Sequence, residues 1–336
     1  MVLEEKIAAL AKLGEYLDQL IHDEGNGIYQ MVEKQNPWFI PAFVKTALIG
    51  IRKYSERKTL EKWVEPYHFN QDKNKRIGLI LAGNIPLVGF HDLLCVLVSG
   101  HTACLKPSHQ DQVLTDHLID KILEIEPGFR SRINKVSAVE HVDAVIATGS
   151  DNSARYFYAY FHKLPHLIRK NRTSVAVLDG NESATDLAGL SRDIFLYFGM
   201  GCRNISKIFI PRNYDPSFLL KGLKTSGFIG DHLKYRNNYL YQRSLSSMLD
   251  LNYLDGGYYL LQESEKLISP VGVIHYSRYR DLMELQEILG IRRDKIQAIV
   301  SNLPGLDQAI PFGRVQFPEP WDYADQVDTL KFLLQL

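Results

Sequence analysis

The sequence contains little cysteine: three residues in 336, at positions 95, 104 and 202. Three cysteines cannot all pair with one another, and their wide spacing is not that of a metal site. A surplus of charge of one sign is also missing, because 39 Lys and Arg residues balance 39 Asp and Glu residues. Nothing in this balance indicates nucleic acid or a membrane surface as a partner. Few cysteines and no disulfide framework are typical of a protein from a reducing compartment.

Long apolar runs are absent as well. A membrane-spanning helix needs roughly 20 consecutive apolar residues, and every run in this chain is far shorter. The N-terminal residues 1–6 resemble the start of an amphipathic helix and not a signal peptide. We therefore expect a cytoplasmic protein that has no membrane span and binds neither nucleic acid nor a metal ion.

The order of the expected elements predicts an α/β protein. Residues 4–23 and 39–67 have apolar residues at helical spacing, so the first seventy residues should be mostly helical. Short apolar strands then alternate with helices, which is typical of a doubly wound parallel sheet. The expected strands are 76–82, 102–106 and 144–147, and the expected helices are 88–98, 111–124 and 155–161.

A second alternation follows, and 336 residues are too many for one ordinary core. Strands are expected at 174–178, 207–210, 271–276 and 296–300, and helices at 184–198, 281–289 and 325–334. The tyrosine-rich stretch 235–259 gives few clear signals. We place the domain boundary near residue 172. This predicts an N-terminal helical and dinucleotide-binding domain (1–172), a cysteine-bearing domain (173–312) and a C-terminal tail (313–336) that packs back on the body or on a partner subunit.

Polar residues follow three of the expected strands. Asn84, Lys106 and Gly149-Ser150 each come directly after a buried strand, and ligands of parallel sheets bind at the carboxyl ends of the strands. A lysine or a Gly-Ser pair alone is more often a surface group or a helix cap. No Gly-x-Gly-x-x-Gly motif follows any strand. A cofactor can still be held by a lysine, a serine and a helix N-terminus.

Cys202 follows the sequence Gly199-Met200-Gly201 and precedes an apolar strand. Glycines allow a close approach of substrate to the backbone, and backbone N–H groups around a thiol lower its pKa and make it a nucleophile. The simpler interpretation of a lone cysteine is a buried residue at a turn. Cys95 on a helix face and Cys104 within a strand are expected to be inert core residues.

The basic segment 162–172 is either a solvated connector or a contact for phosphate groups.

Taken in order, several short motifs resemble those of the aldehyde dehydrogenase superfamily, and most closely its acyl-CoA reductases of the LuxC type. The resemblance covers about residues 76–336. No single motif is strong, but the ordered set is distinctive. It consists of Gly83-Asn84-Ile85-Pro86-Leu87, Leu105-Lys106-Pro107-Ser108, Thr148-Gly149-Ser150, Gly201-Cys202 and Pro311-Phe312-Gly313.

The resemblance implies an aldehyde-dehydrogenase-like fold of two doubly wound α/β domains, with the active site in the cleft between them. It also implies NADPH- or NADH-dependent reduction of an acyl-CoA or acyl-protein thioester to an aldehyde. Cys202 would be the nucleophile that takes the acyl group, and Asn84 would stabilise the oxyanion. The cofactor-binding residues would be Lys106, Ser108, His109, Gly149 and Ser150.

Departures from the family pattern refine this expectation. The Glu that activates water in hydrolytic aldehyde dehydrogenases is replaced by Arg169-Lys170-Asn171-Arg172, which fits thioester exchange rather than hydrolysis. The Glu-x-Phe-Gly-Pro motif that holds the nicotinamide ribose is replaced by residues 266–270. His109 stands where an acidic residue commonly favours NAD, and it would not repel a 2′-phosphate. This favours NADPH.

Two other functions remain open at this point. An acyl-phosphate reductase of the glutamyl-phosphate type shares the architecture and the thiol, and would use an anion-binding residue such as Arg203. A non-catalytic assembly subunit could retain the fold. His91 and His275 are candidate proton donors, although each is more simply a core or surface histidine. The resemblance also suggests a homo-oligomer and an acyl-transferring partner protein.

Overall fold

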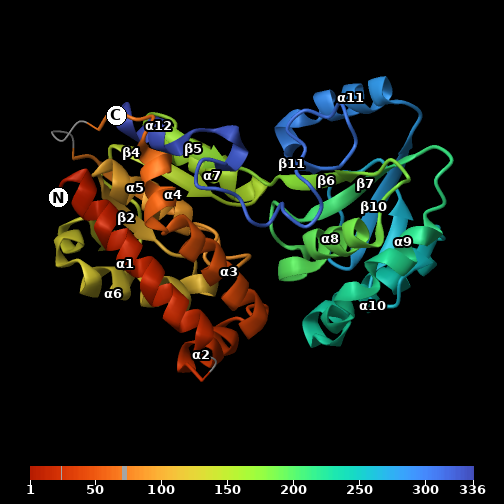
Figure 1. Ribbon diagram of the computed structural model, residues 1–336, viewed down its shortest axis with the longest axis horizontal. Coiled ribbons are helices and arrows are strands. Elements are labelled where there is room, and N and C mark those ends of the chain that lie inside the picture. Colours follow the sequence, from red (N-terminus) through yellow and green to blue (C-terminus); the bar gives the residue numbers. More distant parts are fainter. Residues whose placement is uncertain (24, 70–73) are drawn as a thin grey trace. The chain divides into compact units, whose positions relative to one another are not determined.

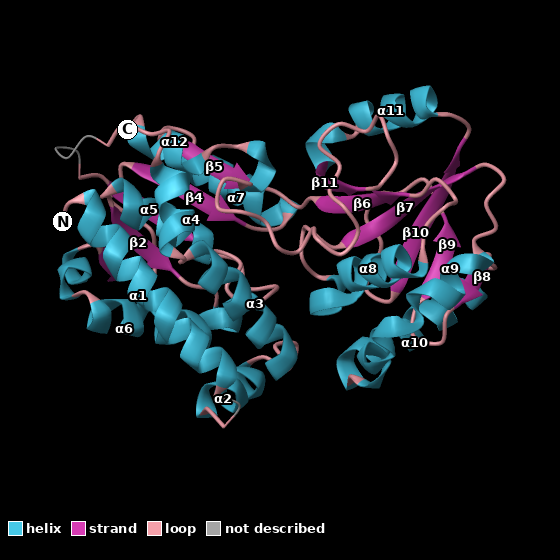
Figure 2. Cartoon of the chain, in the orientation of Figure 1, coloured by secondary structure: helices cyan, strands magenta, loops and turns pink. Residues whose placement is uncertain are grey.

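The computed structural model describes residues 1–23, 25–69 and 74–336. The chain forms two compact units. Unit 1 comprises residues 1–171 together with 318–336, and unit 2 comprises residues 172–317. Each unit contains a β-sheet with helices packed around it (Figures 1 and 2). The C-terminal residues therefore belong to the same unit as the N-terminus.

Unit 1 contains a five-stranded, fully parallel sheet with the order β3-β2-β1-β4-β5. This is the mixed α/β architecture that the alternating pattern predicts. The strand order reverses at β1, so the crevice beside β1 and β4 is the place where such sheets bind ligands. The strands are β1 (Arg76–Ile80), β2 (Thr102–Lys106), β3 (Ile133–Lys135), β4 (Ala144–Thr148) and β5 (His166–Arg169).

The helices of unit 1 share one large apolar core with this sheet. Helix α5 is buried along almost its whole length and ends at Gly100, which has a left-handed φ of 87°. The N-terminal helices α1 and α2 pack on α6, and α12 packs on α5. The helices are α1 (Leu3–His22), α2 (Gly27–Gln35), α3 (Pro41–Tyr54), α4 (Arg57–Val64), α5 (Phe90–Ser99), α6 (Gln112–Ile125), α7 (Asp151–Phe161) and α12 (Thr329–Leu334).

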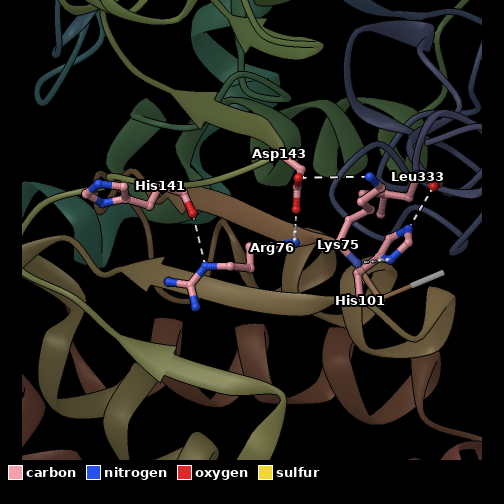
Figure 3. Close-up of polar contacts among 6 residues, drawn as sticks. All are labelled: Lys75, Arg76, His101, His141, Asp143 and Leu333. Carbon is pink, nitrogen blue, oxygen red and sulfur yellow. Dashed lines mark hydrogen bonds and ion pairs between the residues drawn. The ribbon is translucent and has the colours of Figure 1, made fainter.

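His101 connects the start of β1 to the C-terminal helix (Figure 3). Its Nδ1 accepts a hydrogen bond from the backbone N–H of Lys75 at 3.2 Å, and its Nε2 lies 2.9 Å from the Leu333 carbonyl. Because Nδ1 accepts, Nε2 carries the hydrogen and donates it to Leu333. At the same end of β1, the backbone N–H of Arg76 donates a hydrogen bond to the Asp143 carboxylate at 2.7 Å. These contacts lie at the amino ends of the strands and leave the carboxyl ends for ligands.

Only part of the basic segment 162–172 is a solvated connector, in which Lys163 and Lys170 are exposed. The segment also contains edge strand β5, whose last residue, Arg169, is buried. The Arg169 guanidinium pairs with buried Asp92 on α5, and it donates to Thr329 on α12 at 2.8 Å. The sequence did not indicate that Arg169 is buried, because its acceptors lie far along the chain and sequence patterns do not reveal such partners. A contact of the exposed basic residues with phosphate groups stays a prediction.

Unit 2 contains a six-stranded sheet with the order β11-β6-β7-β10-β9-β8. All pairs are parallel except the edge pair of β8 and β9. Helix α11 lies on one face of this sheet, and α8, α9 and α10 lie on the other (Figure 1). The strands are β6 (Thr173–Val177), β7 (Ile205–Pro211), β8 (Tyr253–Asp255), β9 (Leu260–Glu263), β10 (Val273–Tyr279) and β11 (Ile296–Val300). The helices are α8 (Ala184–Phe195), α9 (Ser217–Gly222), α10 (Leu233–Met248) and α11 (Leu282–Ile291).

Two parts of unit 2 differ from the sequence-based expectation. The tyrosine-rich stretch forms α10, β8 and β9; the pattern did not reveal α10 because its exposed face carries Leu233, Leu240 and Met248. Helix α8 ends at Phe195, three residues earlier than expected. None of the helices in the described part of the chain is both long and apolar enough to span a membrane.

Candidate active site

Three strand ends of unit 1 carry the polar residues that the sequence singles out. Lys106 is the last residue of β2, and its register partner on β1 is Ile80. Ile80 also pairs with Ala147 on β4, so the carboxyl ends of β2, β1 and β4 lie side by side. Asn84 follows β1, and Ser150 follows β4. The side chains of Asn84, Lys106 and Ser150 are exposed at this edge.

Gly83 brings the Asn84 loop against Ser108, the residue two positions after Lys106. A Cβ atom at position 83 would overlap the Ser108 side chain, so only glycine permits this approach. The Ser108 Oγ accepts a hydrogen bond from the Gln110 N–H at 3.3 Å and starts the short 3₁₀ turn that contains His109. The structure thus places Asn84, Ser108 and His109 on adjacent loops of one unit.

Asp111, which sequence reasoning missed, holds the Asn84 loop in place. Its carboxylate accepts a hydrogen bond from the Leu87 N–H at 2.8 Å, and from the Thr115 hydroxyl at 3.3 Å. Leu87 has a φ of 56°, a left-handed conformation that is uncommon for leucine and requires support from its surroundings. Burial raises the pKa of Asp111 to about 8. The only signal for Asp111 in the sequence is its position as an acidic residue three residues after the Lys106-Pro107-Ser108 motif.

Helix α2 fixes the His109 segment from the other side. Gln35 donates from Nε2 to the His109 carbonyl at 2.9 Å, and its Oε1 accepts from the Val113 N–H at 3.0 Å. Asn36 donates to the Gln110 carbonyl at 3.3 Å. The N-terminal helices therefore support a predicted cofactor-binding segment, although they lie outside the motifs that first indicated it.

Ser150 is the N-cap of α7, and its Oγ accepts from the Ser153 N–H at 3.2 Å. Gly149 precedes it and packs closely on Ser153, where a Cβ would come within 2.8 Å. Asp151 turns its carboxylate toward the Asn171 N–H at 3.3 Å. The first-turn N–H groups of α7 therefore lie at the carboxyl edge of the sheet, the same edge at which Lys106 ends β2. N–H groups at a helix N-terminus and a lysine charge at the same edge suit an anion.

Cys202 lies in unit 2, in the turn between α8 and β7. Three consecutive residues before it are left-handed: Tyr197, Phe198 and Gly199 have φ values of 52°, 56° and 74°. Left-handed φ values are strained at the two non-glycine residues, Tyr197 and Phe198, and only strong surrounding contacts maintain them. The Phe198 ring packs on the His232 ring at 4.4 Å between centroids, and on Tyr235 of α10.

Asn204 is the residue that organises this turn, and sequence reasoning missed it. Its side-chain oxygen accepts from the Gly201 N–H at 2.8 Å. Its amide nitrogen donates to the carbonyls of Asp193, Ile194 and Leu196 at 2.8–3.1 Å. These carbonyls are at the end of α8, where backbone acceptors lack helical partners. This explains why α8 ends early: Asn204 terminates it and folds the chain back toward Cys202.

The three cysteines differ in burial. Cys95 and Cys104 are buried, as expected, and burial raises the pKa of the Cys95 thiol well above its ordinary value. Cys202 is only half-buried. Its backbone carbonyl accepts from the Ser174 hydroxyl at 3.1 Å, which fixes the turn at the amino end of β6. A half-buried thiol on a rigid turn has the accessibility that a nucleophile needs.

Neither candidate proton donor has the surroundings of an acid catalyst. His91 lies among the rings of Tyr54, Trp63 and Tyr323, and its Nε2 is 2.9 Å from the Pro320 carbonyl. His275 is buried on β10, and burial lowers its pKa to about 4. Its Nδ1 lies 3.2 Å from the Lys266 carbonyl. Both histidines serve the packing of their own unit.

The solved structures that this chain resembles are aldehyde dehydrogenases. The chain matches aldehyde dehydrogenase 21 from Physcomitrella patens with a TM-score of 0.68 and 13% identity, over 92% of this chain and 75% of that one. It matches the aldehyde dehydrogenase KauB from Pseudomonas aeruginosa with a TM-score of 0.66 and 12% identity, over 92% and 73%. The fold is that of the aldehyde dehydrogenases, as expected.

The family model for acyl-CoA reductase (LuxC) matches residues 41–216, which is more than half of the chain. The protein belongs to this family. A curated relative, a long-chain acyl-protein thioester reductase from Photorhabdus laumondii, is 21% identical in an alignment 234 residues long, which covers 63% of this chain and 44% of the relative. The chain thus spans less than half of the length of the relative that it matches.

Proposed function

We propose that this protein reduces an acyl thioester, either an acyl-CoA or an acyl-protein thioester, to an aldehyde through an acyl-Cys202 intermediate. The observation that carries the proposal is the half-buried Cys202 on a turn that Asn204 holds rigid, while the other two cysteines are buried. Family membership and the printed name of the Photorhabdus relative support the substrate class.

The chemistry requires a thiolate and a stabilised oxyanion. The Cys202 thiolate adds to the acyl carbonyl, the bond from carbon to the leaving thiol breaks, and that thiol departs with a proton. We propose that the side-chain amide of Asn84 donates to the developing oxyanion, together with the Cys202 N–H. Removing one such donor typically costs about 2.7–4 kcal/mol of transition-state stabilisation. Cys202 is released as a thiolate when the aldehyde forms.

The strand edge of unit 1 fits a nicotinamide dinucleotide. Lys106 supplies a cation for ribose hydroxyls or phosphate, and Gly149, Ser150 and the first turn of α7 supply N–H groups and a hydroxyl for the pyrophosphate. A bound nicotinamide supplies the hydride that converts the acyl-Cys202 thioester to the aldehyde. Ser108 and exposed His109 are close to the same edge, and a neutral or positive residue at 109 favours NADPH over NADH.

The structure around Arg169 supports reduction rather than hydrolysis. This segment stands where hydrolytic relatives carry the Glu that activates water, and here Arg169 is committed to Asp92 and Thr329. An arginine remains protonated and cannot act as a general base. An acyl-Cys202 thioester would therefore persist until hydride arrives.

The test is the oxidation of NADPH and NADH with a panel of acyl-CoAs of increasing chain length, followed by absorbance. Cys202→Ala should reduce turnover by at least about a thousandfold, as loss of a nucleophile does, and Cys95→Ala should retain it. Unchanged turnover in Cys202→Ala would contradict the proposal. Turnover with acyl phosphates but with no thioester would assign the protein to the acyl-phosphate reductases instead.

A further inference from the structure

The buried acid Asp193 on α8 has no role in the function proposed above. It is 1% exposed, and its Oδ1 has no hydrogen-bond partner within the described part of the chain. Its Oδ2 accepts from the Gly313 N–H at 2.6 Å. A buried carboxylate with an unpaired oxygen is costly for stability. Such a group is retained more readily where it serves positioning than where it serves stability alone.

Asp193 joins two segments that are far apart in the chain. One is residues 311–317, which contains the Pro311-Phe312-Gly313 motif. This segment lies against α8 so closely that a Cβ at Gly189 would come within 2.9 Å of the Gly313 nitrogen. Gly313 itself has a left-handed φ of 80°. The close approach places the Gly313 N–H directly on the Asp193 carboxylate.

The other segment is the Cys202 turn. The backbone carbonyl of Asp193 accepts from the Asn204 amide at 3.1 Å, and the Asn204 oxygen accepts from the Gly201 N–H at 2.8 Å. A second link runs in parallel, because Arg203 donates to the Val315 carbonyl at 3.4 Å. A continuous series of hydrogen bonds therefore runs from Gly313 through Asp193 and Asn204 to the residue before Cys202.

We propose that Asp193 is a positioning residue for Cys202: its carboxylate anchors residues 311–317, and its backbone carbonyl, through Asn204, anchors the turn that presents the thiol. The inference rests on the proposed function, because it concerns the same cysteine, and it adds a residue that contacts neither the substrate nor the thiol. The anchoring of residues 311–317 requires the ionised carboxylate of Asp193, because a charged acceptor holds an N–H more strongly than a neutral one.

Protonation of Asp193 should therefore weaken the anchor. Burial raises its pKa to about 7, while the Gly313 N–H, the Arg192 charge and the Val315 N–H lower it. Arg192 and Asp186 are the other charged residues of α8, and Arg203 and Arg314 lie on the turn and on the segment. The elements packed on α8 also carry charged residues: Lys207 on β7, Lys221 on α9, and Lys224 and Asp231 in the 3₁₀ segment 223–231. Because Asp193 is ionised only above its pKa, the anchor is strong above pH 7 and weakens as the pH falls through this value.

The experiment measures alkylation of Cys202 by iodoacetamide across the neutral pH range, followed by peptide mass spectrometry. It needs neither acyl substrate nor cofactor. Asp193→Ala should slow alkylation above pH 7 by at least about tenfold, because a small displacement of a reacting group has effects of this size. Iodoacetamide reacts with the thiolate, so rates are compared between variants at the same pH. Asp193→Asn keeps a neutral acceptor, so the ratio of the wild-type rate to the Asp193→Asn rate should be near one well below pH 7 and should rise as Asp193 ionises. Glu287→Gln, at an exposed position of α11, is the matched control and should leave the profile unchanged.

Each outcome of the alkylation experiment either supports or overturns the positioning role of Asp193. An Asp193→Ala rate equal to that of the wild type above pH 7 would overturn the inference, and so would a ratio of wild-type to Asp193→Asn rates that stays constant across pH 7. If Asp193→Ala does not fold, the Asp193→Asn profile decides alone. A wild-type Cys202 that resists alkylation would also contradict it. If the wild type and the Asp193 variants differ in alkylation as predicted but the protein reduces no thioester, the proposed function is contradicted and the positioning role of Asp193 still holds.

Discussion

The carboxylate of Asp111 accepts a hydrogen bond from the N–H of Leu87 at 2.8 Å, and Leu87 has a left-handed φ of 56°. The two residues come from different loops at the carboxyl edge of the unit 1 sheet. Asn84 lies three residues before Leu87, and His109 lies two residues before Asp111. One buried acid thus fixes the spacing between the proposed oxyanion donor and the proposed cofactor segment.

Replacing Asp111 should affect activity and pH dependence separately. Asp111→Ala removes the acceptor for Leu87, and we expect kcat/KM for thioester reduction to fall by at least about tenfold as Asn84 moves. Asp111→Asn keeps an oxygen acceptor and should retain most activity. The pKa of Asp111 is raised from 3.8 to about 8, so its contribution to stability is complete below pH 3.8 and is lost as the pH rises through 8.

Urea unfolding at several pH values between 3.8 and 8 measures this effect. The wild type should lose stability as the pH rises through this window, and Asp111→Asn should lose less. The exposed Asp120 on α6, the helix that Asp111 caps, provides the control, because Asp120→Asn should behave as the wild type does. Equal pH dependence in Asp111→Asn and the wild type would show that Asp111 does not titrate in this range.

Asn204 should dominate the stability of unit 2 near Cys202. Asn204→Ala leaves three carbonyls at the end of α8 and the Gly201 N–H without this partner, and we expect a loss of about 2–4 kcal/mol in the free energy of unfolding. Asn204→Asp should be worse, because it places carboxylate oxygen against carbonyl oxygens. Asn237→Ala, on the exposed face of α10, is the control. A loss below that of the control in thermal unfolding would refute the role of Asn204.

The buried pair of Arg169 and Asp92 should show strong coupling. Arg169→Met leaves the Asp92 charge buried without compensation, which typically costs about 3–5 kcal/mol. The double variant Arg169→Met with Asp92→Leu removes both charges and should recover most of this loss. A double-mutant cycle measured by denaturant unfolding gives the coupling energy directly. Additive effects would mean that the two groups do not act as a pair.

His275 should make the protein less stable in mild acid. Its pKa is lowered from 6.5 to about 4 by burial, so the folded state keeps it neutral while the unfolded state takes up a proton. Its contribution is therefore present above pH 6.5 and is lost as the pH falls toward 4, by roughly 3 kcal/mol in total. His275→Gln should remove this part of the pH dependence. The measurement is the free energy of unfolding at several pH values in this window.

Much of the fold and part of the site could be predicted from the sequence. The central residues of strands β1, β2 and β4 are continuous apolar runs, and local composition determines such elements almost alone. The position of Lys106 at the carboxyl end of β2 was predictable because it directly follows such a run, and its role in a site stays a prediction. Asp111, Asp193 and Asn204 were not predictable, because each acts on a backbone group of another element, and a local pattern does not show that partner. Helix α10 was missed because its exposed residues include Leu233, Leu240 and Met248, which hide the helical spacing of its buried residues.

The central claim is that Cys202 carries the acyl group. The most direct measurement is the intact mass of the protein after incubation with a long-chain acyl-CoA in the absence of nicotinamide cofactor, followed by peptide mapping. The account predicts one added acyl group on Cys202, absent in Cys202→Ala, which disappears with release of aldehyde when NADPH is added. An acyl group on another residue, or aldehyde formation by Cys202→Ala, would contradict it.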